Sequence, residues 1–333
     1  MPELLNEAEI QLLASLHALE VKNRAADAAG LDERGEGYWM YREDWSSAAP
    51  ALLDKGLIAR DGETLRLTDS GRAPARECHA ERPDYYWYYF QQFYRRAHLS
   101  AAHSRFCEQV YGLDLCQEGM LDMDALHDLI GRLNLDAGQQ LLDLGCGAGG
   151  ISEYISDRCD AIVTGIDYSK TAIATARHRC RDKASRLCFI EGDLNHLDLE
   201  PGRYDAAIAI DSIYWVSDPG ETLKAILQAL RPGGLLLIII VHTPQQAEPL
   251  ELDQTDLAKA IMRLEVDFEA VDCSAAFADF WPRIDKTLAV LAGEFEREGN
   301  LFIHRNWKRE AESEFLPALA ARRLRRYLYQ IRA

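Results

Sequence analysis

The sequence lacks any apolar run long enough to cross a lipid bilayer. A membrane-spanning helix needs roughly 18 or more consecutive apolar residues, whereas the longest run here, Leu235 to Val241, has the length of a strand. The first residues are acidic and do not show the charge pattern of a secretory signal peptide. We therefore expect a cytoplasmic protein with no membrane association.

Positive charge is also scarce. The 37 Lys and Arg residues are outnumbered by 54 Asp and Glu residues, which leaves a net charge of −17. Such a charge repels nucleic acid backbones and anionic lipid surfaces, so the composition disfavours both as partners. The arginine-rich run at 322–326 is a local exception. We interpret it as a solvated helix end that leads into a strand, with a basic patch as the alternative.

The eight cysteines do not include a Cys-x-x-Cys pair, the spacing typical of structural zinc sites. We therefore expect no metal centre and mostly buried, reduced thiols. Hydrophobic residues make up 48% and charged residues 27% of the 333-residue chain. This composition is ordinary for a globular protein, and the length is sufficient for two domains.

The chain divides into three predicted segments. Residues 1–75 combine helical apolar spacing at 9–18 and 49–56 with a hairpin signal at Asp61-Gly62. This order resembles a winged-helix module. Because acidic side chains outnumber basic ones in this segment, we favour dimerisation or substrate covering over DNA binding as its role. Residues 76–135 are predicted to form a helical linker and active-site lid, and residues 136–333 an α/β domain.

From Gln140 onward, short apolar segments alternate with helical ones, which is typical of a doubly wound parallel sheet. The first apolar segment, 140–144, leads into Gly145-x-Gly147-x-x-Gly150 and then into a helix. Glycines let the backbone turn sharply and let a ligand approach the main chain, and helix N-terminal amides face that ligand. Taken alone, this spacing also fits a dinucleotide-binding dehydrogenase.

Asp143, two residues before the first glycine, separates these alternatives. A carboxylate there would repel a pyrophosphate but suits a ligand with an amino group. The segment resembles motif I of the class I, Rossmann-like S-adenosylmethionine-dependent methyltransferases of small-molecule type, and the resemblance covers roughly residues 104–245. It implies S-adenosylmethionine as cofactor and a seven-stranded sheet. The last two strands are expected at 262–272 and 326–331, with the final strand antiparallel.

The resemblance also implies which residues hold the donor. Asp143 and the glycine-rich turn would bind its amino-acid end, and Asp167 would accept hydrogen bonds from its ribose. The residues after the second and third strands would contact the adenine, and those after the fourth strand would lie near the methyl group. The predicted cofactor-binding residues are Asp143, Gly145, Cys146, Gly147, Asp167, Tyr168, Asp193, Leu194, Asp211 and Ser212.

Further candidates surround the expected acceptor. His242 directly follows the fifth strand, and its ordinary pKa of about 6.5 suits proton transfer, so it is the candidate general base. Tyr214 is the second catalytic candidate. Related enzymes fold the segment before motif I over the cofactor as a lid, and the predicted lid or substrate residues are Tyr111, Gln117, Met120 and Trp215. Plain packing is the alternative role for each of them.

We therefore predict methyl transfer from S-adenosylmethionine to nitrogen or oxygen of a small-molecule acceptor. The alternative is a metabolite-sensing, DNA-binding regulator with a methyltransferase-like domain. The segment 211–214 lacks both prolines of the amino-group DNA methyltransferases, which argues against nucleic acid as the acceptor. A homodimer formed through the N-terminal domain is one candidate assembly, and the oligomeric state and the role of that domain stay open. The identity of the acceptor, the atom that is methylated and the use of a general base stay open.

Overall fold

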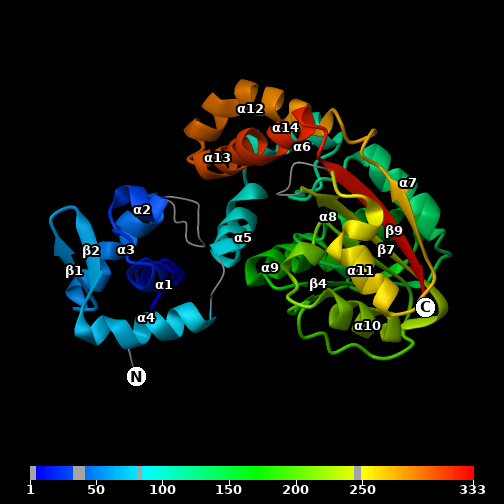
Figure 1. The fold of residues 1–333 in the computed structure, drawn as a ribbon, viewed down its shortest axis with the longest axis horizontal. Coiled ribbons are helices and arrows are strands. Elements are labelled where there is room, and N and C mark those ends of the chain that lie inside the picture. Colours follow the sequence, from blue (N-terminus) through cyan, green and yellow to red (C-terminus); the bar gives the residue numbers. More distant parts are fainter. Residues whose placement is uncertain (1–4, 33–41, 82–84, 244–248) are drawn as a thin grey trace. The chain divides into compact units, whose positions relative to one another are not determined.

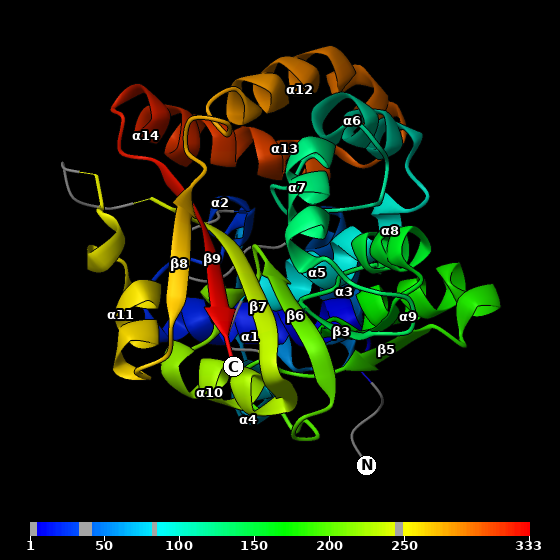
Figure 2. The same ribbon diagram turned by 90° about the vertical axis from the view of Figure 1, so that its right-hand side faces the viewer.

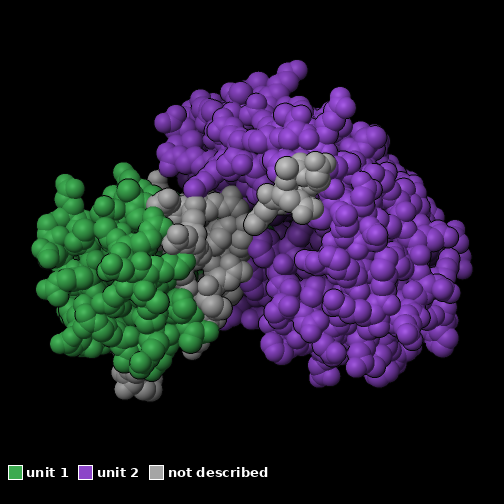
Figure 3. All heavy atoms as spheres, viewed as in Figure 1, with its two compact units in different colours: residues 1–92 green, residues 93–333 purple. Residues whose placement is uncertain are grey.

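The computed structural model describes residues 5–32, 42–81, 85–243 and 249–333. The chain divides into two compact units, Met1–Gln92 and Phe93–Ala333, shown in green and purple in Figure 3. The predicted linker of residues 76–135 is therefore shared between the two units instead of forming a segment of its own. No helix among the described residues is long and apolar enough to cross a membrane.

The first unit consists of helices and one hairpin. Asn6 caps its first helix by accepting a hydrogen bond from the amide of Glu9, and Leu12 of that helix is fully buried. The hairpin forms at Asp61-Gly62, where the sequence predicts it. The description of this unit as a winged helix stays a prediction. Its elements are α1 (Glu7–Val21), α2 (Ala28–Asp32), α3 (Arg42–Asp54), β1 (Ile58–Asp61), β2 (Thr64–Leu67) and α4 (Asp69–Glu81).

The second unit is built on a seven-stranded sheet with the strand order β5-β4-β3-β6-β7-β9-β8. Strands β4, β7 and β9 of this sheet are labelled in Figure 1. Strands β3 to β7 run parallel, and β9 is antiparallel to both of its neighbours. This arrangement confirms the predicted Rossmann-like α/β fold. The strands are β3 (Gln140–Leu144), β4 (Ile162–Asp167), β5 (Leu187–Glu191), β6 (Tyr204–Ile210), β7 (Leu230–His242), β8 (Phe268–Asp272) and β9 (Arg325–Arg332).

Helices cover both faces of the sheet because neighbouring residues of a strand point to opposite sides. In β3, Leu141 packs in the core layer of α7 (Met123–Leu133), α8 (Gly150–Cys159) and α9 (Lys170–Arg179). The next residue, Leu142, packs in the layer of α10 (Pro219–Ala229) and α11 (Asp256–Arg263). Both leucines are fully buried. This two-sided core fixes the carboxyl ends of the parallel strands along one edge.

The segment between β7 and β9 differs from the prediction. Met262 lies on α11, which Thr255 caps, and only Phe268–Asp272 of the predicted strand 262–272 is extended. The helix α12 (Phe280–Arg297) follows β8. Two further helices, α13 (Leu301–Glu310) and α14 (Leu316–Ala320), come after it and are joined by a π-helical turn; neither was predicted from the sequence.

These later helices form a cap with α6 (Ala101–Tyr111). Figure 2 shows α6, α12, α13 and α14 together beyond one end of the central strands. Aromatic rings connect them: Trp281 stacks on Phe315 with 3.8 Å between ring centroids, and Phe106 contacts Trp307 at 5.7 Å. Aromatic pairs of this kind stabilise a fold beyond the area that they bury. The cap is therefore a packed part of the second unit.

We expect Leu142→Ala to destabilise the second unit by about 2–5 kcal/mol, because it removes a fully buried side chain from the middle of the sheet. Denaturant unfolding followed by tryptophan fluorescence measures this loss. The matched control is Val290→Ala on α12, where the side chain is 68% exposed and the change in stability should stay below about 0.5 kcal/mol. Equal effects of the two substitutions would contradict the assignment of Leu142 to the core.

Candidate active site

The candidate site lies where β3 and β6 run side by side. After β3 the chain adds strands on one side, and after β6 it adds them on the other, so a crevice opens between the two exits. The hydroxyl of Ser212 donates a hydrogen bond to the carbonyl of Leu144 at 2.6 Å and ties the exits together. Gly145 has a φ of +81°, and a Cβ there would lie 2.4 Å from the Cβ of Ser212. Only glycine allows this approach.

Asp167, at the end of β4, holds the glycine-rich turn. Its carboxylate accepts hydrogen bonds from the amides of Gly147 at 2.9 Å and Ser169 at 2.8 Å. Each carboxylate oxygen accepts one of these bonds, so each has capacity for another from a ligand hydroxyl. Burial raises the pKa of Asp167 to about 6, and the two amide bonds act against that rise. The predicted ribose-binding acid therefore lies directly beside the turn.

Asp143 is a second buried acid at this edge. It is 3% exposed, and the hydroxyl of Ser152 on α8 donates to it at 2.5 Å. Burial raises the pKa of Asp143 to about 6; the bond from Ser152 opposes this effect, and the charge of Asp167 adds to it. Two buried carboxylates thus lie close enough to influence each other, which favours a cationic ligand between or beside them.

A small pocket of about 50 Å³ adjoins Asp143 and the turn. Its walls come from the turn after β3, from residues 115–119, and from Tyr94 on α5 (Tyr85–Ala97). A Cβ on Gly147 would lie 2.4 Å from the Tyr94 hydroxyl, so this ring closes tightly over the turn. Within the described part of the chain, the lining residues include Glu118 and Asp143 but neither Lys nor Arg. We call this cavity the donor pocket.

The three residues predicted at the adenine lie after β4 and β5. Tyr168 follows Asp167 and is half-buried. The carboxylate of Asp193 accepts hydrogen bonds from the amide and side chain of Asn195 at 2.9 and 2.8 Å. The carbonyl of Leu194 accepts a bond from the Thr222 hydroxyl at 3.2 Å. Their contact with adenine stays a prediction.

Asp211, directly after β6, has a different role from the one predicted for its side chain. Its carboxylate accepts two bonds from the Arg326 guanidinium, each at 3.0 Å, one from the Met120 amide at 2.7 Å and one from the Tyr214 hydroxyl at 3.1 Å. Four donors of the chain itself saturate the two oxygens. We therefore correct the prediction that this carboxylate binds the cofactor. The Ser212 hydroxyl is likewise bonded to the chain, through Leu144.

The predicted lid residues are placed by the same local bonds. The side-chain amide of Gln117 accepts from the Leu115 amide at 2.8 Å and donates to the Leu113 carbonyl at 3.3 Å, so it shapes its own turn. Met120 contributes its backbone amide to Asp211. Tyr111 is 1% exposed, and its hydroxyl makes no hydrogen bond within the described residues.

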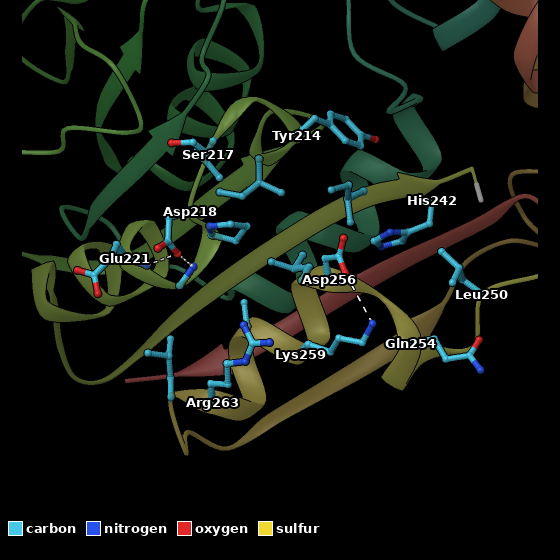
Figure 4. Close-up of a pocket in the computed structure, with 18 residues that line it drawn as sticks. Tyr214, Ser217, Asp218, Glu221, His242, Leu250, Gln254, Asp256, Lys259 and Arg263 are labelled. Carbon is cyan, nitrogen blue, oxygen red and sulfur yellow. Dashed lines mark hydrogen bonds and ion pairs between the residues drawn. The ribbon is translucent and has the colours of Figure 1, made fainter. Parts of the chain in front are cut away.

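The two catalytic candidates line a larger groove of about 980 Å³ along α10 and α11. Figure 4 shows His242 and Tyr214 toward one end of this groove and Asp218 and Glu221 toward the other. The neighbouring Trp215 is 40% exposed, and its ring centroid lies 6.1 Å from that of Tyr214. The groove places these candidates beside the exits of β6 and β7.

Tyr214 and His242 differ in what their polar atoms can do. The Tyr214 hydroxyl donates to Asp211 and accepts from the Val241 amide at 2.8 Å, and burial raises its pKa well above the usual value. It therefore stays protonated and bound on both sides. Nε2 of His242 lies 3.1 Å from the hydroxyl of Tyr329. Burial lowers the pKa of His242 to about 4, although Asp256 opposes this, so the imidazole is neutral at physiological pH.

Comparison with known proteins places this geometry in a family. A family model described as a methyltransferase domain matches residues 142–238, which include β3 to β6, the glycine-rich turn and most of β7. The chain is 32% identical over 109 residues to methyltransferase GfsG of Streptomyces halstedii, a match that covers 32% of this chain and 39% of that protein. It is 28% identical over 149 residues to phosphoethanolamine N-methyltransferase 1 of Arabidopsis thaliana, covering 45% and 30%.

Among solved structures, phosphoethanolamine N-methyltransferase 2 of Haemonchus contortus, in complex with phosphomonomethylethanolamine and S-adenosylhomocysteine, has the same fold. The TM-score is 0.58 at 18% identity, over 73% of this chain and 59% of that one. The chain contains a class I methyltransferase domain. It spans less than half the length of each of the two curated relatives, so the likeness is that of a domain and not of whole proteins.

The methyltransferase domain also uses residues that the sequence analysis missed. Ser152 orients Asp143, Tyr94 covers Gly147, and Arg326 neutralises Asp211. Arg326 belongs to the run interpreted as a solvated helix end, yet its side chain is only 2% exposed. The interpretation of this residue as solvated is wrong. The available signal was its position at the start of the expected final strand, 326–331; the structure pairs it with Val241 in the sheet. Among the described residues, no group of three or more His, Cys, Asp or Glu side chains is arranged to hold a metal ion.

We predict that Asp143→Asn stabilises the unliganded methyltransferase domain at pH 8 by roughly 1–3 kcal/mol. The folded state binds this proton more tightly than the unfolded state, so the stabilising contribution of Asp143 is full below about pH 4 and is lost as pH rises through its folded pKa of about 6. Asparagine carries no charge and still accepts from Ser152. Thermal unfolding at pH 4, 6 and 8 measures the effect.

The gain of Asp143→Asn should shrink toward pH 4, where the parent carboxyl is protonated. Asp182→Asn is the control, because that side chain is 86% exposed and should leave the pH dependence unchanged. A variant that is no more stable than the parent at pH 8 would rule out an unfavourable buried charge at Asp143.

Proposed function

We propose that this protein binds S-adenosylmethionine at the carboxyl edge of the sheet, with the amino-acid end of the cofactor at the donor pocket, and transfers its methyl group to nitrogen or oxygen of a small-molecule acceptor. The pocket of about 50 Å³ is too small for the whole cofactor, so the ribose and adenine would lie outside it, toward Asp167. The observation that carries the proposal is the acidic lining of this pocket, with Glu118 and Asp143 and without Lys or Arg among its described residues. Such a lining repels the pyrophosphate of a dinucleotide and attracts an ammonium group and a sulfonium.

The residues present fit this cofactor at both ends. Asp143 would accept a hydrogen bond from the amino group, while Gly145 and Gly147 leave the backbone of the turn without side chains of their own at these two positions. Asp167 keeps acceptor capacity for ribose hydroxyls while it holds the turn through the Gly147 amide. When bound, the cofactor supplies a methyl group that the positive sulfur already activates. The chain's own task is then to align the acceptor and to exclude water.

His242 is the residue that we propose as general base for an acceptor that loses a proton. It is neutral at physiological pH, so a ring nitrogen is free of a second proton, but burial holds its pKa at about 4 instead of the 6.5 expected from the sequence. The imidazole is therefore a weaker base than expected, and the proposal rests on its place in the groove. The hydroxyl of Tyr329 lies 3.1 Å from the His242 ring and 3.0 Å from the Thr255 hydroxyl, which orients the imidazole. An amine acceptor attacks through its own lone pair and needs no base beforehand. The response to removal of His242 therefore distinguishes the two acceptor classes.

The relatives support a small-molecule acceptor in general terms, since their names describe methyltransferases that include enzymes of phosphoethanolamine. We further propose that the first unit serves dimerisation or covers the acceptor, in a cytoplasmic protein. A DNA-binding regulator with the same domain is the competing function. It predicts sequence-dependent DNA binding by the first unit and no turnover, which electrophoretic mobility shifts and a methylation assay separate.

Calorimetric titration tests the donor assignment. S-Adenosylhomocysteine should bind the parent protein, whereas NAD should not. Asp167→Ala should weaken the binding at least tenfold, since it removes the ribose acceptor and frees the Gly147 amide. Gly147→Val should do the same, because its side chain would collide with the Tyr94 hydroxyl. The exposed control Asp182→Ala should bind as the parent does. Unchanged affinity in both Asp167→Ala and Gly147→Val would refute the site.

A second measurement tests His242. After a screen of amines, phenols and carboxylates has identified an acceptor, His242→Ala should reduce kcat for a hydroxyl acceptor about 10²-fold or more, without changing the affinity for S-adenosylhomocysteine. In the parent enzyme, the rate should fall only as pH drops toward about 4, where the imidazole becomes charged. His178→Ala, on the exposed side of α9, is the control. Full activity of His242→Ala on a hydroxyl acceptor would exclude the histidine as base.

A further inference from the structure

Arg326 and Asp211 form an ion pair that is almost completely removed from solvent. Their side chains are 2% and 3% exposed, and the guanidinium meets both carboxylate oxygens at 3.0 Å. The two residues lie 115 positions apart in the sequence. Asp211 also adopts a φ of +48°, a conformation that residues other than glycine rarely take. The two-point ion pair and the rarely adopted backbone conformation together mark a specific contact between the last strand and the end of β6.

The carboxylate of Asp211 connects this pair to both sides of the site. One oxygen accepts the Met120 amide at 2.7 Å, and Met120 directly follows residues 115–119, which line the donor pocket. The other oxygen accepts the Tyr214 hydroxyl at 3.1 Å, and Tyr214 lines the groove along α10 and α11. The Tyr214 hydroxyl in turn accepts the Val241 amide, one residue before His242.

Arg326 reaches this position from a firmly held backbone. Its amide donates to the Ser274 hydroxyl at 3.0 Å, its carbonyl accepts from the Cys273 amide at 2.8 Å, and it lies opposite Val241 in the sheet. The guanidinium also lies over the ring of Phe277, 4.5 Å from its centroid. The backbone and the guanidinium of Arg326 are therefore held by the sheet and by Phe277. Through Asp211, Arg326 sets the positions of Met120 and Tyr214.

We propose that Arg326 is a positioning residue for the donor pocket, and that it holds residues 117–121 and Tyr214 in register through the carboxylate of Asp211. The inference rests on the methyl-transfer function proposed above. Without the guanidinium, Asp211 would be an unpaired buried charge, and its carboxylate would turn toward water. That rotation releases the Met120 amide and loosens the wall of the pocket that contains Glu118.

Hydrogen exchange of the Met120 amide tests this role without any activity assay. In Arg326→Gln this amide should exchange at least tenfold faster than in the parent, while the amides of α7 and β3 exchange as before. The affinity for S-adenosylhomocysteine should fall about tenfold. Arg326→Lys keeps the positive charge but loses one of the two hydrogen bonds to Asp211. Its Met120 exchange rate and its affinity for S-adenosylhomocysteine should therefore lie between those of the parent and of Arg326→Gln. This variant also keeps the proposal testable if Arg326→Gln does not fold.

The matched control is Arg231→Gln, which breaks another Arg–Asp pair of the same sheet, to Asp205 at its amino edge. It should change neither Met120 exchange nor affinity. Met120 exchange as slow in the Arg326 variants as in the parent would overturn the proposal. So would equal acceleration of all amides in the domain, which indicates a role in stability alone. If the parent does not bind S-adenosylhomocysteine, the proposed function fails, and Met120 exchange still decides the role of Arg326.

Discussion

At the carboxyl ends of β3 and β6, the two backbones approach so closely that a side chain on Gly145 would overlap Ser212. The Ser212 hydroxyl donates a hydrogen bond to the Leu144 carbonyl, with 2.6 Å between the two oxygens, and this bond holds the two strand ends together. The glycine-rich turn on one side and Asp211 on the other therefore start from a common point. Because ligands of open α/β sheets bind at such a switch point, the donor pocket and the groove along α10 and α11 both lie at its borders.

Three buried carboxylates lie near this point, and they differ in whether an arginine pairs with them. Asp211 is neutralised by Arg326, so its charge serves the fold. Within the described residues, Asp143 and Asp167 receive hydrogen bonds but no cationic side chain, and burial raises the pKa of each to about 6. Two buried carboxylates of this kind cost stability at neutral pH, and a cationic ligand would offset that cost. The ion pair with Arg326 thus makes Asp211 a structural acid, whereas Asp143 and Asp167 are the two acids suited to binding a ligand.

The sequence was sufficient for features that depend on local patterns. The Gly145-x-Gly147-x-x-Gly150 spacing and the alternation of strands and helices led to the correct fold class and to the place of the turn. It was insufficient where distant residues meet. Nothing near Asp211 indicates that an arginine 115 positions later saturates it. Met262 was misassigned because an apolar stretch of that length fits a strand or one face of a helix equally well, and Thr255 capping decided for the helix.

The last strand gives the site a property that the family motifs do not describe. β9 follows the helical cap in the chain and carries Arg326 into the middle of the second unit. A change in the cap that shifts β9 would therefore reach the carboxylate of Asp211, and through it both Met120 and Tyr214. The cap lies beyond the end of the central strands (Figure 2). The Arg326–Asp211 pair is therefore the contact by which the strand that follows the cap meets the residues beside the donor pocket.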